Sequence, residues 1–345
     1  MNGLSIAELR SHVPIDAVIQ NGEPQIEWLR IADAKFNDPF FHETVERIRR
    51  ERPQLRSVYT DLDALLQVAK LAKASEPSGL ILHTSRCGST LVANACRALG
   101  GARIFAEAPV VDKLVSRLFT DAPHNSTREL LYLTLVRAAI EILGRSGDES
   151  TTPYVVKFAA ASILQISRIR RICPTVPIVI LYRHPLEILV SNLRNPPHWM
   201  VIDNNPLTAA AIAGVGVDQL REMSSEEFCA LSLGRFYSAA ETIAHDPSVM
   251  FLDYDELSLE TLQSVVEFFG VARSSEELSA IESATRAHSK EPGRSFSADA
   301  AEKRQGASYP AVQMTEKWAM PAYRHLVELT KQLRSGALLN TVKAN

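Results

Sequence analysis

Residues 79–91, with the sequence GLILHTSRCGSTL, carry the signal that decides the fold. The first five residues, Gly79 to His83, form an apolar run that predicts a buried strand. A loop of small residues follows and leads directly into a helical pattern that begins at Ser89. A strand that passes through such a loop into a helix directs backbone N–H groups and the positive end of the helix dipole at one point. The stretch therefore predicts a site for phosphate or sulfate.

Short apolar runs alternate with helix-length segments from Gly79 onwards, which is typical of a parallel sheet covered by crossover helices. In such sheets the ligand lies beyond the carboxyl ends of the strands, so the residues that follow each strand are expected to form one neighbourhood. The further predicted strands are 103–106, 154–157, 177–182 and 249–252. The predicted helices are 89–99, 126–143, 162–172, 186–193 and 259–269.

The part of the chain before this region is predicted to be helical. Residues 42–52 are rich in charge, and residues 61–74 have an amphipathic helical pattern. Pro77 and Gly79 then mark a break. We therefore expect a helical N-terminal extension over residues 1–76 and an α/β domain over residues 77–345.

The composition predicts a soluble globular protein. Of the 345 residues, 46% are hydrophobic and 22% are charged, and the formal net charge is −3, which gives no global attraction to nucleic acid or to anionic membranes. The chain has neither a signal-peptide pattern at its start nor a run of about eighteen apolar residues. Its four cysteines lack the spacing of a disulfide framework or a zinc site. We expect a cytoplasmic protein without a membrane span or a metal.

Four charged residues follow or close the predicted strands: Arg86, Glu107, Lys157 and Arg183. Each of them alone has a structural explanation, because polar residues commonly begin where a strand ends. Glu107, for example, precedes a helix start at Pro109, where an acid is favourable, and Lys157 would find a salt-bridge partner in a nearby carboxylate. Four such residues beside an anion-binding loop predict a functional rim.

Three segments resemble, in order, the motifs of sulfotransferases that use 3′-phosphoadenosine 5′-phosphosulfate (PAPS). Residues 84–91 resemble the loop that binds the 5′-phosphosulfate, and residues 181–192, LYRHPLEILVSN, resemble the segment that binds the 3′-phosphate. Residues 251–257, FLDYDEL, with the helical segment up to Gly270, resemble the strand, turn and helix that follow in the family. The resemblance implies the P-loop-like sulfotransferase fold, PAPS as co-substrate, 3′-phosphoadenosine 5′-phosphate (PAP) as product, and no metal.

The resemblance also implies which residues bind the nucleotide. The amides of residues 85–90 and the side chain of Arg86 would hold the 5′-phosphate, and the hydroxyls of Ser89 and Thr90 would add hydrogen bonds or cap the helix. Arg183 and Ser191, eight residues apart, match the family's arginine and serine that grip the 3′-phosphate. The implied cofactor-binding residues are Ser85, Arg86, Cys87, Gly88, Ser89, Thr90, Arg183 and Ser191.

Glu107 resembles the glutamate that acts as base in the tyrosylprotein and Golgi-type branches of the family. Lys157, by resemblance to the same branches, would stabilise the bridging oxygen in the transition state. Arg86 stands where cytosolic members carry lysine, which favours the branch with a carboxylate base. The implied catalytic residues are Glu107, Lys157 and Arg86. Histidine is the base in the cytosolic branch, so the alternative bases are His83, His124 and His198.

Two other functions remain open at this point. An ATP-dependent P-loop kinase is one, although the chain lacks the Gly-x-x-x-x-Gly-Lys-Ser/Thr pattern of such enzymes. A non-catalytic nucleotide-binding module is the other. For a sulfotransferase, the acceptor would be a hydroxyl or amine of a small molecule, sugar, lipid or peptide, which the sequence does not define, and neither does it define the oligomeric state. The basic residues of the late loop that the resemblance brings over the adenosine are Lys290, Arg294, Lys303 and Arg304.

Overall fold

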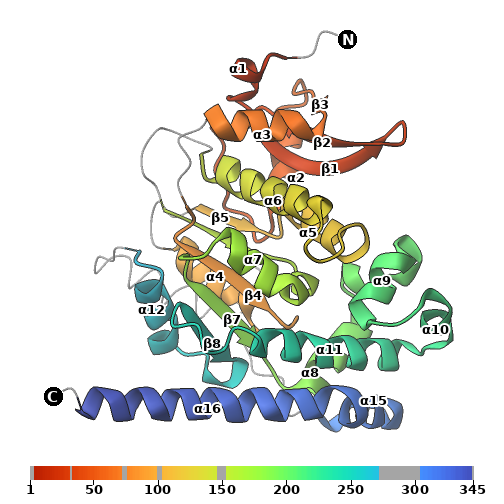
Figure 1. Ribbon diagram of the computed structural model, residues 1–345, viewed down its shortest axis with the longest axis vertical. Coiled ribbons are helices and arrows are strands. Elements are labelled where there is room, and N and C mark those ends of the chain that lie inside the picture. The colour runs from red at the N-terminus through yellow and green to blue at the C-terminus, as the bar shows by residue number, and fades with distance from the viewer. Residues whose placement is uncertain are drawn as a thin grey trace.

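The computed structural model, which describes residues 4–31, 33–71, 76–98, 103–145, 153–271 and 304–343, is built around a five-stranded parallel sheet (Figure 1). All four strand pairs are parallel, in the order β5-β6-β4-β7-β8. The predicted α/β fold with a parallel sheet flanked by helices is confirmed, and each observed strand end lies within one residue of its prediction. The strands are β4 (Gly79–His83), β5 (Arg103–Ala106), β6 (Tyr154–Lys157), β7 (Ile178–Tyr182) and β8 (Val249–Asp253).

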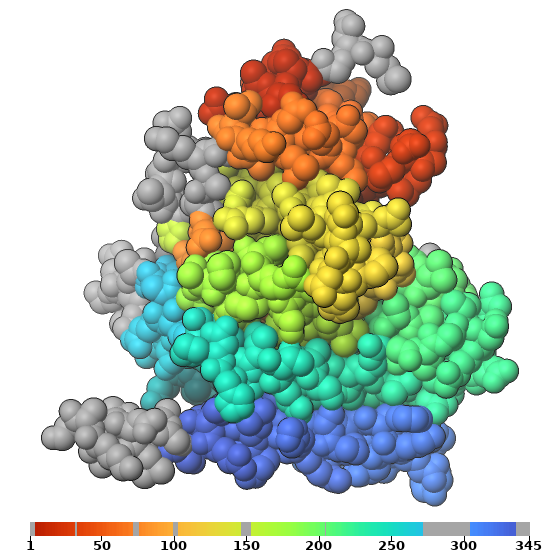
Figure 2. Space-filling view, in the orientation of Figure 1, coloured from red at the N-terminus to blue at the C-terminus, as the bar shows by residue number. Residues whose placement is uncertain are grey.

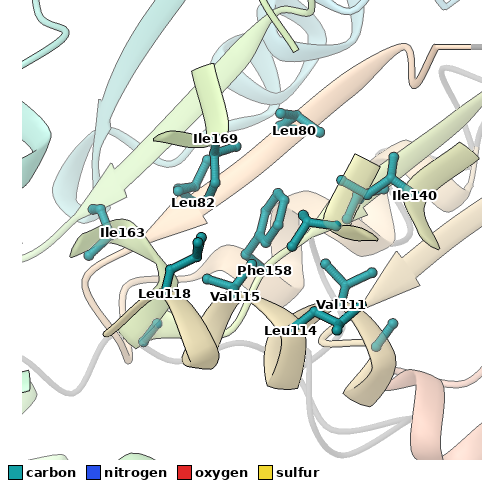
Figure 3. Packing of buried hydrophobic residues seen from close by; sticks show 14 of the residues in the cluster. Leu80, Leu82, Val111, Leu114, Val115, Leu118, Ile140, Phe158, Ile163 and Ile169 are labelled. Atoms are coloured by element: carbon teal, nitrogen blue, oxygen red, sulfur yellow. The ribbon is translucent and has the colours of Figure 1, made fainter. Parts of the chain in front are cut away.

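Successive residues of β4 bury their side chains on opposite faces of the sheet, as the period of two requires. Ile81 joins a core with α4 (Ser89–Arg97) and α12 (Leu259–Phe268). Leu80 and Leu82 join the larger core on the other face, where Figure 3 shows them facing side chains of α5 (Pro109–Thr120) and the segment after β6. Each such leucine contributes roughly 1.5–3 kcal/mol by leaving water. Helices α6 (Thr127–Arg145), α7 (Ile166–Ile172), α8 (Pro185–Arg194) and α11 (Ser225–Glu241) complete this face.

The prediction of a helical N-terminal extension is wrong in part, because this region also contains a sheet. Strands β1 (Val13–Gln20), β2 (Glu23–Leu29) and β3 (Val58–Thr60) form a separate three-stranded antiparallel sheet. Its hairpin turns at Asn21 and Gly22, which both have positive φ, and this is the backbone that a two-residue hairpin turn with the twist of the strands needs. The helices of this region are α1 (Ile6–Leu9), α2 (Phe41–Glu51) and α3 (Leu62–Leu71), of which the last two were predicted.

The N-terminal sheet and the central sheet share one continuous core. Helix α3 packs on α6, and β1 packs on α5, so Trp28 and Leu65 belong to the same buried cluster as Leu80. Trp28 is fully buried, and its indole N–H donates to the Thr60 hydroxyl at 2.9 Å. This packing places the loop before α2 over the carboxyl ends of the central strands, where Phe40 reaches Lys157.

The C-terminal part ends in the long helix α16 (Met320–Lys343), which runs beside α11 along one edge of the molecule (Figure 1). It follows α15 (Tyr309–Met314) and a π-helical turn, η5 (Thr315–Ala319). The chains of α11 and η5 approach so closely that a Cβ at Gly234 would lie 2.3 Å from the carbonyl oxygen of Trp318, which explains the glycine. The remaining elements are η1 (Ala160–Gln165), η2 (His198–Met200), η3 (Ile202–Asn204), α9 (Pro206–Ala213), α10 (Val217–Glu222) and η4 (Tyr254–Glu256).

Two further expectations concern the cysteines and the membrane. All four cysteines, Cys87, Cys96, Cys173 and Cys229, are buried free thiols, and Cys87 is buried although it lies in the loop after β4. Within the described ranges, no helix combines the length and the apolar character that crossing a bilayer requires.

Candidate functional site

The loop between β4 and α4 has the backbone shape of an anion cradle. Ser85, Arg86 and Gly88 have φ values of 74°, 48° and 80°, in the left-handed region that non-glycine residues rarely adopt. Gly88 is the N-cap of α4 and supplies no side-chain cap. The first amides of α4 therefore have no intrahelical acceptor and no cap, and they can bind an anion at the positive end of the helix dipole.

Gly88 is required here for two reasons. Its φ lies in the region where only glycine is unstrained, and a Cβ would lie 2.4 Å from Cδ1 of Leu257. Tyr254 and Leu257, which crowd this position, belong to the segment that follows β8. The third sequence motif, which contains these two residues, thus packs against the loop of the first motif.

One predicted detail of the loop needs correction. The amide of Ser85 donates to Nδ1 of His83 at 3.2 Å, so it is already used within the protein. The Ser85 hydroxyl donates to Oδ1 of Asn192 at 3.3 Å. An anion would therefore be held by the amides after Ser85, with the buried hydroxyls of Ser89 and Thr90 beside them.

Arg86 is fixed against the end of α8. Its Nε donates to Oδ1 of Asn192 at 3.2 Å, and its Nη2 donates to the carbonyl of Asn195 at 2.6 Å. Burial lowers the pKa of the guanidinium, although nearby Glu107 opposes this. Asn192 directly follows Ser191 in the second motif, so the two motifs are connected through a residue that the sequence analysis did not single out.

Glu107 and Lys157 meet because of the strand register. Lys157 is paired with Ala106 of β5 and with Ile81 of β4, so the residue after Ala106 and the end of β4 both lie beside it. The ammonium of Lys157, which is 1% exposed, donates to Oε1 of Glu107 and lies 5.0 Å from the ring centroid of Phe40. Glu107 itself has a positive φ of 51°, a strained conformation that turns the chain at the end of β5.

His83 is the third member of this group. Its Nδ1 accepts the Ser85 amide, so the proton of the neutral ring is on Nε2, which donates to the carbonyl of Phe158 at 3.1 Å and lies 3.7 Å from Oε1 of Glu107. Burial acts to raise the pKa of Glu107, but Lys157 and His83 outweigh it and hold that pKa well below its usual range. Glu107 is therefore an ionised carboxylate that is committed to two neighbours.

Arg183 lies under the loop. Its Nη1 donates to the carbonyl of Arg86 at 3.2 Å, its Nε donates to Glu187 at 2.6 Å, and its guanidinium stacks 3.7 Å from the ring centroid of Tyr254. Glu187 is fully buried, and its other oxygen accepts from Arg304 at 2.6 Å. Arg304 is thus the described member of the predicted late basic loop, and Lys290, Arg294 and Lys303 lie outside the described residues.

A cavity of about 1310 Å³ adjoins the loop and brings most of the predicted residues together. Its lining residues include residues 85–90, Glu107 and Lys157. The other walls come from the β1–β2 hairpin, α5, residues 195–201 and α9. Figure 2 shows an indentation of the surface between the hairpin and α9. Arg183 and the half-buried Ser191 are not among the lining residues, so the predicted 3′-phosphate pair lies beside this cavity and not in its wall.

The alternative bases differ in position. His83 and His198 line the cavity, whereas His124 does not and lies 3.4 Å from Glu129. The cavity also includes Asp112, which the sequence analysis missed. A signal was present, because Asp112 is the first acid after Glu107 and falls in the first turn of α5.

No family model matches the chain, and no curated protein is similar enough to count as a relative. Solved structures with a similar fold include the sulfotransferase STF9 from Mycobacterium avium, at 11% identity and a TM-score of 0.44, covering 82% of this chain and 80% of that one. A sulfotransferase from Alicyclobacillus acidocaldarius has 13% identity and a TM-score of 0.37, covering 71% and 96%. Retinol dehydratase in complex with androsterone and the inactive cofactor PAP has 13% identity and a TM-score of 0.37, covering 78% and 87%. Similarities this distant leave the activity to be inferred from the site.

Proposed function

We propose that this protein is a sulfotransferase that moves a sulfuryl group from PAPS to a hydroxyl or amine. The observation that carries the proposal is that the uncapped N-terminus of α4 lines the same cavity as Lys157 and Glu107. An anion-binding helix terminus, a buried ammonium and a carboxylate are the groups that transfer of a sulfuryl group between two oxygens requires.

The nucleotide fits the chain's own groups. The amides after Ser85 and the hydroxyls of Ser89 and Thr90 would hold the 5′-phosphate, with Arg86 at its side. Arg183 would hold the 3′-phosphate from below the loop together with Ser191, since a planar guanidinium suits a phosphate. Bound PAPS would supply the activated sulfuryl group. Lys157 would stabilise the negative charge that develops on the bridging oxygen when the S–O bond breaks.

The resemblance assigns the base to Glu107. Its carboxylate is ionised at neutral pH and lines the cavity, so it can accept a hydrogen bond from an acceptor hydroxyl. The ion pair with Lys157 orients it, and the same ion pair makes it a weak base. Membership of the branch with a carboxylate base therefore remains a proposal.

The alternative functions are weaker. A kinase would need a lysine on the β- and γ-phosphates and a group to hold Mg²⁺. The chain lacks the sequence pattern for this lysine. A binding module without activity would not need a strained Glu107 paired with a buried lysine, because such groups are costly unless they serve chemistry.

Calorimetric titration with PAP tests the proposal. We expect micromolar binding that persists in excess EDTA, exceeds the binding of ATP with Mg²⁺, and is lost in Arg183→Ala. Arg324→Ala is the matched control, because Arg324 is an exposed arginine of α16 whose only described partner is Glu316. Absence of PAP binding to the unmodified protein at millimolar concentration would refute the proposal. Tighter binding of ATP with Mg²⁺ than of PAP would favour the kinase.

A further inference from the structure

Asp112 lies on the wall of the cavity that Glu107 and Lys157 also line. It belongs to the first turn of α5, which starts two residues after Glu107. The backbone turn at Glu107 and the helix start at Pro109 therefore bring a second carboxylate to the wall of the same cavity. Neither the motifs nor the resemblance gives this residue a role.

The two oxygens of Asp112 have different environments. Oδ1 accepts the amide of Ala159 at 2.9 Å and the hydroxyl of Ser162 at 3.3 Å. Ala159 lies two residues after Lys157, so Asp112 is fixed to the segment that carries the buried ammonium. Oδ2 has no hydrogen-bond partner among the described residues. One oxygen thus holds the carboxylate in place, and the other is left for a ligand.

Glu107 is less able to take up a proton. Its carboxylate carries the ion pair with Lys157 and lies close to His83, and these neighbours would be left without their partner if it became protonated. A buried lysine without its carboxylate is costly. Protonation of Asp112 at Oδ2 leaves both hydrogen bonds at Oδ1 intact.

The surroundings of Asp112 make it a better proton acceptor than Glu107. Burial is the largest effect and raises the pKa of Asp112 to about 7. The hydrogen bonds from Ala159 and Ser162 and the charge of Lys157 lower this pKa, and the charge of Glu107 raises it. A base is most effective when its pKa is near the working pH. On α5, Lys113 pairs with Asp16 of β1 and Arg117 pairs with Asp121. On α6, Glu129 pairs with Arg168 and Arg171, Arg137 pairs with Glu141, and Arg128 and Arg145 donate to backbone carbonyls. The segments η1 and α9 contain no charged residue.

We propose that Asp112 is the catalytic base of the transfer and that Glu107 is a positioning residue that holds the ammonium of Lys157. The acceptor oxygen forms a bond to sulfur, the bond between sulfur and the bridging oxygen breaks, and its electron pair stays on the phosphate of PAP. The acceptor proton goes to Oδ2 of Asp112. This inference rests on the proposed function and reassigns one role within it.

The decisive variant is Asp112→Asn. Its amide oxygen can still accept the hydrogen bonds from Ala159 and Ser162, so the anchoring is retained and only the proton-accepting oxygen is replaced. Asp218→Asn is the matched control, because Asp218 is an exposed carboxylate of α10 and neither it nor its partner Arg221 lines the cavity. The reaction is release of labelled sulfate from PAPS with water as acceptor, measured against pH with PAP affinity recorded in parallel.

We expect the rate of the unmodified protein and of Asp218→Asn to rise with pH through about 7, because the deprotonated form of Asp112 is active. Asp112→Asn should lower the rate by about 10²–10⁴-fold, lose this rise, and bind PAP normally. Glu107→Gln should lower the rate and keep the rise. If Glu107→Gln fails to fold, the result for Asp112→Asn alone decides whether Asp112 is the base.

The inference is overturned if Asp112→Asn keeps the pH-dependent rise or a rate within about twofold of the unmodified protein. Infrared titration of the PAP-free protein gives a readout that needs no turnover. It should show a carboxyl group titrating near pH 7 that Asp112→Asn removes, and absence of this signal also overturns the inference. Failure of PAP binding in the unmodified protein would instead refute the proposed function, so the two failures are distinguishable.

Discussion

Arg183 and Glu187 form a buried ion pair in which the effects of each residue on folding and on ligand binding can be separated. The side chain of Arg183 is 4% exposed and that of Glu187 is 0% exposed. Removing one member of such a pair leaves an uncompensated charge and costs roughly 3–5 kcal/mol, whereas removing both costs much less. Because domains of this kind are stable by only about 5–15 kcal/mol, the single change is readily measured.

The perturbation is Arg183→Met, alone and combined with Glu187→Gln. Methionine keeps an apolar stem against the ring of Tyr254, which the guanidinium contacts at 3.7 Å. The single variant leaves Glu187 with Arg304 as its partner, and Arg304 is 46% exposed and therefore a weakly compensating one. In the double variant the released Arg304 is solvated. We expect a loss of about 3–5 kcal/mol for Arg183→Met and recovery of most of it in the double variant.

PAP affinity should respond differently. Hydrogen bonds to a charged group contribute about 1.5–3 kcal/mol each, so loss of Arg183 should weaken PAP binding by at least tenfold in both variants. The assays are urea denaturation followed by tryptophan fluorescence, and calorimetry with PAP. If the double variant recovered stability and also bound PAP as the unmodified protein does, Arg183 would be a structural residue only and the assignment of the 3′-phosphate site would be wrong.

Two further predictions concern the loop and Lys157. Gly88→Ala should cost roughly 1–2 kcal/mol from its φ of 80° alone, and more from the contact with Leu257, so thermal denaturation should show a lower midpoint and PAP should no longer raise it. An unchanged rise with PAP would contradict the loop assignment. Phe40→Leu removes the ring that lies 5.0 Å from the ammonium of Lys157, an interaction of about 1–2 kcal/mol when desolvated. Sulfate release from PAPS should fall by about tenfold with PAP affinity unchanged, and a loss of PAP affinity instead would show that Phe40 supports the nucleotide.

The central sheet could be predicted from the sequence because its strands are buried on both faces. Such strands are continuous apolar runs, and the residues that end them, such as His83 and Lys157, are the first polar ones. Some of the helices between them have a clear start signal, since α4 begins after Gly88 and α8 begins at Pro185. The helices α9, α10 and α11, between β7 and β8, were not predicted. The strand order, in contrast, has no local signal, since β4 lies between β6 and β7 and pairs with neither of its neighbours in sequence.

The N-terminal sheet was missed although it had a local signal. Asn21 and Gly22 form the dipeptide that most strongly indicates a two-residue hairpin, and the apolar positions on both sides alternate. The charge of residues 42–52 and the amphipathic pattern of residues 61–74 correctly indicated helices. The helical prediction was then extended to residues 13–29, whose apolar residues alternate with the period of a strand. The error matters for the site, because this sheet packs on α5 and forms part of the cavity wall.

The individual site residues were predictable where backbone geometry decides their position. Glu107 meets Lys157 because adjacent parallel strands end together, which any parallel sheet would impose. Asp112 was not predictable as a base, because its pKa depends on burial by segments distant in sequence. The same holds for Asn192, whose role becomes visible only when Ser85 and Arg86 are seen to donate to it.

The walls of the cavity are positioned in two different ways. This difference explains why the motifs define the expected nucleotide site and leave the rest of the cavity undefined. The part of the wall that would hold the nucleotide consists of strand ends and a helix terminus. The sheet fixes the geometry of these elements, and they have a recognisable sequence pattern. The remaining walls come from the β1–β2 hairpin, α5 and α9, which are positioned by side-chain packing. Packing tolerates exchange of apolar residues of similar volume, so these walls can change with little effect on the fold. We therefore expect the acceptor of the proposed transfer to be selected by these walls, which carry no motif. Acceptor screening with substitutions in these walls tests this expectation.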